Sequence, residues 1–220
     1  FLSLGYSSIR TSVIHGSHIN QRNFYFQKLS LSKRPLKFTM LARLVRDKGI
    51  SEYLEAAREC KSRFPNLVEF SLVGDIDLKN PTSLTKADIE EIKKEGLIEL
   101  KGFEDNVSSL IADSHFIVLP SYREGFPRVL IEAMAIGRPI ITTNVPGCRE
   151  CIVDNGFLVR PRDSADLLRA FIDSLSLSDS ELDGMSRNSL RIFEEKLNPK
   201  LIINKHEKIY DFLFDPALVR

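Results

Sequence analysis

Short apolar runs alternate along this chain with segments whose apolar residues recur at helical spacing. The runs cover residues 36–42, 67–73, 98–100, 115–119, 139–143 and 156–159. Most of them lack the regular apolar and polar alternation of a strand with one face in water, so both faces should be buried. Buried strands separated by helices form a parallel sheet covered on both sides. The sequence therefore predicts a Rossmann-like, doubly wound α/β domain with helices on both faces.

Helical periodicity and end signals place the helices between these runs. Apolar residues recur at helical spacing over 50–64, and Pro65 follows at once. Further helices are expected at 85–95, at 106–112 with Asn106 as N-cap, and at 128–136, where Gly137 ends the helix. Three amphipathic helices follow from residue 164 onward.

Residues 1–35 differ in pattern, with one short strand predicted at 12–15 and a turn at 16–17. We expect residues 1–11 to be a linker or the tail of a preceding domain. Residues 12–220 would then form the α/β domain with its C-terminal helices. Because Phe1 is not an initiator Met, the chain is expected to begin inside a longer protein.

Composition excludes several classes of function. The 220 residues are 43% hydrophobic and 28% charged, with a net charge of +1, so no basic field favours nucleic acid and a bound anion needs a local site. The three Cys residues show no metal-ligand spacing, which indicates a reducing, cytoplasmic location. The His and Cys residues form no cluster in the sequence, so no metal site is predicted. No apolar run approaches the roughly 20 residues of a membrane span.

The segment 43–49, between the first strand and the first helix, carries two candidate anion ligands. Ligands of open parallel sheets bind at the carboxyl ends of the strands. Arg43 and Lys48 lie at such an end beside a helix N-terminus, a combination that suits a diphosphate. A solvated basic loop is the alternative that the spacing leaves open.

A second segment, 121–128, leads from a strand into a helix and contains a carboxylate. Glu124 lies at the carboxyl end of the strand, Gly125 permits close backbone approach, and Pro127 suits the first turn of a helix. Glu132 follows on a helix that is otherwise apolar, where burying a carboxylate is costly unless a partner satisfies it. A sugar or ribose diol and a structural salt bridge are equally good partners on these grounds.

These residues together resemble a known family. Glu124 and Glu132 are separated by seven residues, and segments 124–127 and 132–135 are similar to the EX7E signature of retaining GT-B glycosyltransferases. Segment 42–49 resembles the phosphate element of that family, with Ala42 in place of the usual Gly, and segments 137–140, 145–150 and 155–159 match in order. The resemblance covers about residues 12–175. It identifies the chain with the C-terminal, donor-binding domain of the glycosyl transferases group 1 family, which includes bacterial capsule and O-antigen sugar transferases.

The resemblance implies roles for particular residues in one half of a GT-B fold. Arg43 and Lys48 would hold the diphosphate of a UDP-sugar, Glu132 would bind the ribose hydroxyls, and Glu124 would face the donor sugar. The residues around these contacts would be Gly125, Phe126, Pro127, Val129 and Leu130, with Gly74 and Phe103 near the base. The resemblance implies no metal or other cofactor.

It further implies retaining transfer by front-face attack to a glycan or lipid-linked acceptor in bacterial surface polysaccharide biosynthesis. The acceptor would bind through an N-terminal domain that this chain lacks, so the fragment should be inactive alone. Peripheral contact of the full-length protein with the inner face of the cell membrane is expected. A non-catalytic nucleotide-sugar-binding module and a nucleotide-sugar epimerase-like domain are the alternative functions.

Overall fold

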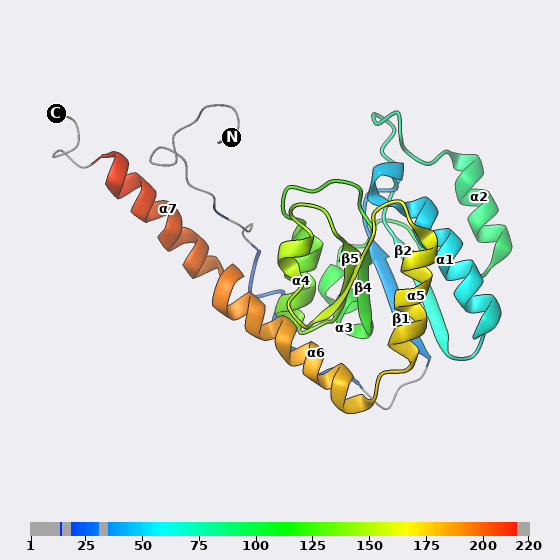
Figure 1. Cartoon of the computed structure of the whole chain (residues 1–220). Helices are drawn as coiled ribbons and strands as arrows, with labels where there is room; N and C mark the ends of the chain where they lie inside the picture. The colour runs from blue at the N-terminus through cyan, green and yellow to red at the C-terminus, as the bar shows by residue number, and fades with distance from the viewer. Residues whose placement is uncertain (1–13, 15–18, 31–34, 215–220) are drawn as a thin grey trace.

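A computed structural model describes residues 14, 19–30 and 35–214. Its six strands form one sheet in the order β3-β2-β1-β4-β5-β6 (Figure 1), and every neighbouring pair is parallel. The strands are β1 (Leu36–Leu41), β2 (Val68–Val73), β3 (Glu99–Lys101), β4 (Phe116–Leu119), β5 (Ile140–Thr143) and β6 (Gly156–Val159). The predicted parallel sheet is confirmed, and each predicted run agrees with a strand to within two residues.

Helices cover both faces of this sheet (Figure 1). On one face lie α1 (Ile50–Arg63), α2 (Lys86–Glu95) and α5 (Ser164–Leu175), and on the other lie α3 (Val107–Asp113), α4 (Arg128–Ile136) and α6 (Asp179–Ile192). The buried apolar residues accordingly divide into two clusters, one on each side. The doubly wound architecture is confirmed.

Stacked aromatic rings fill the layer between the sheet and helices α1 and α5. The Phe38 ring lies 5.2 Å from that of Phe70, 5.4 Å from that of Phe116 and 4.9 Å from that of Phe171, centroid to centroid. Burying each such side chain contributes about 1.5–3 kcal/mol to stability. Tyr53 of α1 is also buried, and its hydroxyl donates towards the carbonyl oxygens of strands β1 and β2. This cluster binds the helical layer to the sheet.

The predicted helix ends are present. Asn106 caps α3 by accepting a hydrogen bond from the backbone N–H of Ser109, and Thr85 forms a capping box at the start of α2. Helix α4 covers the predicted residues and ends at Gly137, whose φ of 82° lies in the left-handed region that glycine tolerates.

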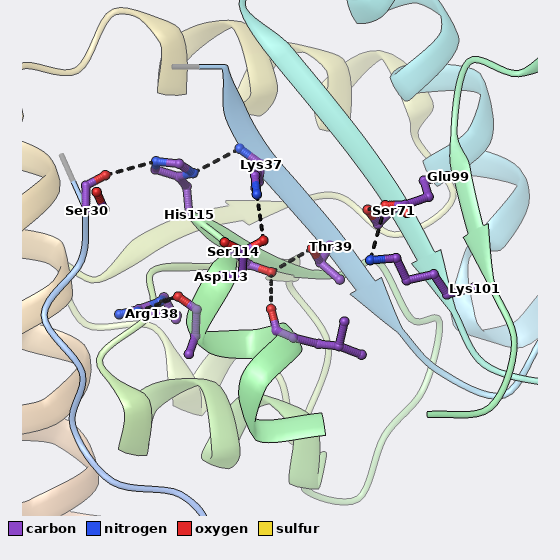
Figure 2. Close-up of polar contacts among 12 residues, drawn as sticks. Ser30, Lys37, Thr39, Ser71, Glu99, Lys101, Asp113, Ser114, His115 and Arg138 are labelled. Carbon is purple, nitrogen blue, oxygen red and sulfur yellow. Dashed lines mark hydrogen bonds and ion pairs between the residues drawn. The ribbon is translucent and has the colours of Figure 1, made fainter. Parts of the chain in front are cut away.

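Two buried polar side chains, Arg138 and His115, attach the segment 19–30 to the domain, and Figure 2 shows the contacts of His115 with Ser30 and Lys37. Arg138, 1% exposed, donates to the carbonyl oxygens of Ala112 and Gln27, both at 2.7 Å. Arg138 thereby joins the C-terminal end of α3 to the segment 19–30. His115 accepts a hydrogen bond from the Lys37 N–H at 3.0 Å through Nδ1, and its Nε2 lies 3.3 Å from the Ser30 carbonyl oxygen. With 3% of its surface exposed, His115 is a structural residue of the sheet.

The last helices extend away from the sheet (Figure 1). A π-helical turn, Phe193–Leu197, joins α6 to α7 (Pro199–Leu213). If these helices pack on another domain, the apolar faces around Ile202, Tyr210 and Phe214 are expected to be exposed in this chain. Tyr210 and Phe214 are 58% and 76% exposed, but Ile202 is 6% exposed, so the prediction for Ile202 is wrong.

Among the described residues, no helix is long and apolar enough to cross a membrane. Of the strand predicted at 12–15 only residue 14 is described, and the turn at 16–17 and the domain boundary after residue 11 lie outside the described residues.

Candidate functional site

The loops that follow β1, β2 and β4 meet at one edge of the sheet, because parallel strands end on the same side. Two glycines allow this contact. Gly49, at φ 76°, lies against the β4 end, where an added Cβ would be 2.0 Å from the Pro120 carbonyl oxygen. Gly74, at φ 146°, lies against the β1 end, where a Cβ would be 1.9 Å from the Ala42 carbonyl oxygen. Only glycine accepts both the backbone conformation and the close approach.

An ion pair joins the loop after β1 to the loop after β4. The Lys48 ammonium lies 2.5 Å from Oε1 of Glu124, and the two side chains are 21% and 11% exposed. Arg43 is more open: its side chain is 63% exposed, and its guanidinium donates to Asp77 at 2.7 Å. Both cations line one cavity, so the predicted convergence of Arg43 and Lys48 at the sheet edge is confirmed as geometry.

That cavity has a volume of about 480 Å³ and polar walls. Besides the predicted cations it is lined by Tyr122, Arg123 and Arg162, which sequence reasoning did not select. The Tyr122 hydroxyl lies 2.6 and 2.8 Å from the two carboxylate oxygens of Glu52, and the Arg162 guanidinium lies 4.6 Å from the centre of the Tyr122 ring. Burial, together with the Glu52 carboxylate, raises the pKa of Tyr122 to about 12. Tyr122 and Arg123 belong to the selected segment 121–128, whereas nothing in the sequence pattern marks Arg162.

Glu132 points its carboxylate towards a second cavity, of about 620 Å³, which Arg22 and Arg128 also line. Its side chain is 12% exposed, and burial raises its pKa, while the nearby Arg128 acts in the opposite direction. The salt bridge weighed as an alternative is therefore present, but Arg128 is 64% exposed and 3.7 Å away. Such surface pairs contribute only about 0–1 kcal/mol. The carboxylate retains the capacity to accept hydrogen bonds from a ligand.

The N-terminus of α4 lies between these carboxylates. Its N-cap, Pro127, has no N–H and makes no side-chain cap bond. Within the described chain, the N–H groups of Arg128 and Val129 have no acceptor, whereas the Leu130 N–H donates to the Pro127 carbonyl at 3.1 Å. Leu130 is also fully buried, so it can act only through packing, and Val129 carries the free amide. A helix N-terminus with unpaired amides attracts anions.

The remaining predicted residues lie around the same edge. Gly125 is exposed and has open space at its Cβ position, and Phe126 packs partly against the α4 layer. Gly74 and Phe103 line a third cavity of about 540 Å³, together with Arg43 and Leu78. Phe103 and Leu78 are 76% and 85% exposed. Sequence reasoning missed Leu78, which lies in a polar stretch without periodicity.

The three cavities and the α4 N-terminus together form a site at the carboxyl ends of the strands, and their chemistry indicates the kind of ligand it accepts. Cations, free amides and carboxylates occur together at the carboxyl edge of a Rossmann-like sheet, which suits an anionic ligand that also presents hydroxyl groups. No group of three or more His, Cys, Asp or Glu residues in the described ranges has the arrangement of a metal site.

Comparison with known proteins gives the family. Residues 35–176 match the model of the glycosyl transferases group 1 family, and the chain belongs to that family. An α-1,3-N-acetylgalactosaminyltransferase acting on N,N'-diacetylbacillosaminyl-diphospho-undecaprenol, from Campylobacter jejuni, is 28% identical over 87% of this chain and 48% of its own length. An Escherichia coli UDP-Gal:α-D-GlcNAc-diphosphoundecaprenol α-1,3-galactosyltransferase is 30% identical over 90% of this chain and 50% of its own length.

The chain thus spans about half the length of the curated relatives that it matches. Among solved structures, sucrose-phosphate synthase from Thermosynechococcus elongatus is 25% identical, with a TM-score of 0.75, over 90% of this chain and 51% of its own. The Anabaena protein Alr3699/HepE, solved in complex with UDP, is 22% identical, with a TM-score of 0.78, over 96% of this chain and 59% of its own. The structural neighbours are GT-B enzymes, so the predicted half of a GT-B fold is confirmed.

Proposed function

We propose that this chain is the donor-binding domain of a retaining glycosyltransferase that takes a UDP-sugar. The acceptor is a glycan or a lipid-linked sugar, in bacterial surface polysaccharide biosynthesis. Support for the donor comes from the relative at 30% identity, whose name specifies UDP-Gal. Support for the acceptor class comes from the two relatives named for diphospho-undecaprenol-linked sugars.

The observation that carries the proposal is the ion pair between Lys48 and Glu124 at 2.5 Å, with Arg43 on the same cavity. It brings a cation and a carboxylate from two loops to the point where a donor's diphosphate and its sugar are adjacent. Breaking the glycosidic bond leaves negative charge on the departing nucleoside diphosphate. Arg43 and Lys48 stabilise that charge, which is electrostatic assistance to departure. The N–H of Val129 and the dipole of α4 add to it.

The other cavities accommodate the rest of the nucleotide. The Glu132 carboxylate accepts two hydrogen bonds from the ribose diol, which relieves the cost of its burial. The base occupies the cavity between Gly74 and Phe103, where exposed apolar side chains provide a surface for its flat ring.

Glu124 faces the donor sugar, beside the open space at Gly125. With Lys48 as its partner it positions the sugar hydroxyls, and the acceptor attacks from the face that the nucleoside diphosphate leaves. We therefore assign Glu124 a functional role and do not make it a covalent nucleophile. Transfer needs the acceptor-binding half, so this chain should bind the donor and not turn it over. Cytoplasmic location and contact with the inner membrane face remain predictions.

Calorimetric titration of the chain with UDP and GDP tests the proposal. We expect saturable binding of UDP, weaker binding of GDP, and no turnover of UDP-glucose or UDP-galactose. Absence of binding by both nucleotides to the folded chain would refute the donor assignment. The alternative of a non-catalytic module is decided with the full-length protein, because nucleotide binding without any hydrolysis or transfer in that form favours the module.

A further inference from the structure

The 480 Å³ cavity carries more positive charge than a donor diphosphate requires. Four cations line it, namely Arg43, Lys48, Arg123 and Arg162, against the single carboxylate of Asp47. Arg43 and Lys48 have carboxylate partners in the chain, Asp77 and Glu124. The remaining positive charge comes from Arg123 and Arg162.

Arg123 and Arg162 have no carboxylate partner within the described ranges. Most other arginines there do, as in the pairs Arg58–Glu95 and Arg187–Asp183, and the buried Arg138 is satisfied by carbonyl groups. Guanidinium groups left without a partner at one cavity are available to an anion, which they can bind through two parallel hydrogen bonds.

Arg162 is also held in place. Its φ of 58° lies in the left-handed region, which is unfavourable for a residue that has a Cβ atom. Its guanidinium stacks on the Tyr122 ring at 4.6 Å, and Glu52 holds the Tyr122 hydroxyl through both carboxylate oxygens. A strained backbone and a fixed aromatic platform together present an unpaired cation to the cavity, an arrangement that occurs at ligand sites.

Arg123 and Arg162 lie outside the two cavities assigned to the donor's base and ribose. The donor's base and ribose belong to the cavities at Gly74 and Glu132, and neither Arg123 nor Arg162 lines those cavities. Arg43 lines both the Gly74 cavity and the 480 Å³ cavity, so it stands between the two. The base and ribose of a bound nucleotide therefore leave Arg123 and Arg162 free, and its diphosphate contacts Arg43 and Lys48 of the same cavity.

We propose that Arg123 and Arg162 bind a second anion, the diphosphate ester of the acceptor, beside the donor's diphosphate. The inference rests on the proposed function and deepens it, because it assigns part of acceptor recognition to this half of the enzyme. Two diphosphates brought close together repel each other strongly. Arg43 and Lys48 between them reduce that repulsion, and the two unpaired arginines anchor the acceptor's anionic group. The sugar to be extended is then held near the donor sugar at Glu124.

The test is calorimetry on the chain with saturating UDP present, at low ionic strength, with inorganic pyrophosphate and geranyl diphosphate as probes. We expect both probes to bind together with UDP. In the double variant R123Q/R162G each probe should bind at least about tenfold more weakly, since each lost charge-assisted contact is worth about a factor of ten. UDP affinity should stay within about twofold. Glycine suits the backbone of residue 162, so the variant should fold, and thermal unfolding checks this.

Arg187→Gln is the matched control, because Arg187 is an exposed arginine on α6, away from the cavity, and its removal should leave both probes unchanged. Two results would overturn the proposed second anion site. One is competition between pyrophosphate and UDP for a single site, and the other is equal probe binding by the wild type and the double variant. Binding of pyrophosphate without geranyl diphosphate overturns the acceptor assignment and indicates a free inorganic anion. If UDP fails to bind, the proposed function fails, and probe binding measured without UDP still shows whether the two arginines form an anion site.

Discussion

Replacing Glu124 by Gln should tighten the binding of UDP. In the free chain the Lys48 ammonium is held by Glu124 at 2.5 Å, so a diphosphate must compete with this carboxylate for the same cation. Gln keeps the shape of the side chain and removes its negative charge. UDP carries no sugar for Glu124 to bind, so only the competition is lost.

The size of the effect follows from the geometry. A phosphate oxygen that accepts from another N–H of the same ammonium would lie about 4–5 Å from the Glu124 carboxylate. At about 5 Å, repulsion between two unit charges is about 0.8 kcal/mol in water and about 3 kcal/mol at an effective dielectric constant of 20. Because Glu124 is 11% exposed, an intermediate value of about 1–2 kcal/mol is expected. UDP should therefore bind about five to thirty times more tightly.

Calorimetric titration of wild type, Glu124→Gln, Lys48→Gln and the double variant measures this. Lys48→Gln should weaken UDP binding about tenfold or more, and the gain from Glu124→Gln should shrink in the Lys48→Gln background. Unchanged or weaker UDP binding by a folded Glu124→Gln chain would refute the reasoning, because it would mean that Glu124 does not compete with the nucleotide for Lys48.

Four further substitutions distinguish effects on UDP binding from effects on the stability of the fold. Glu132→Gln should weaken UDP binding about tenfold in calorimetry. Because burial raises the pKa of Glu132, the native state binds more protons than the unfolded state, so the wild type loses stability relative to this variant as the pH rises above about 4.3, the ordinary pKa of Glu. Equal profiles of stability against pH for the two proteins would contradict this. Arg138→Met should lower the free energy of unfolding in urea by about 3 kcal/mol, because two buried carbonyls lose their donor, and a loss below about 1 kcal/mol would contradict it. Gly49→Ala should lower the free energy of unfolding by more than about 3 kcal/mol, because the added Cβ clashes with Pro120, and it should weaken UDP binding. Gly184→Ala is the control, because Gly184 lies in the middle of α6 with open space at its Cβ position, and it should raise the free energy of unfolding by about 0.5–1 kcal/mol.

The sequence by itself determined the elements and the principal candidate residues. Continuous apolar runs, Asn106 as a cap and Gly137 as a helix end are local signals, and each describes only the residues around it. The pair Glu124 and Glu132 is a local signal as well, because the seven residues that separate them within one loop and helix are visible in the sequence. The roles of these residues and the domain boundaries stay predictions.

Tertiary structure alone decided which distant residues meet. The order of the sheet places β1 beside β4, which brings Lys48 to Glu124 across 76 residues. The same packing carries Arg162 over Tyr122 and buries Ile202. No periodicity encodes these contacts, since they depend on how the sheet and its helices close on one another rather than on the residues adjacent in the chain.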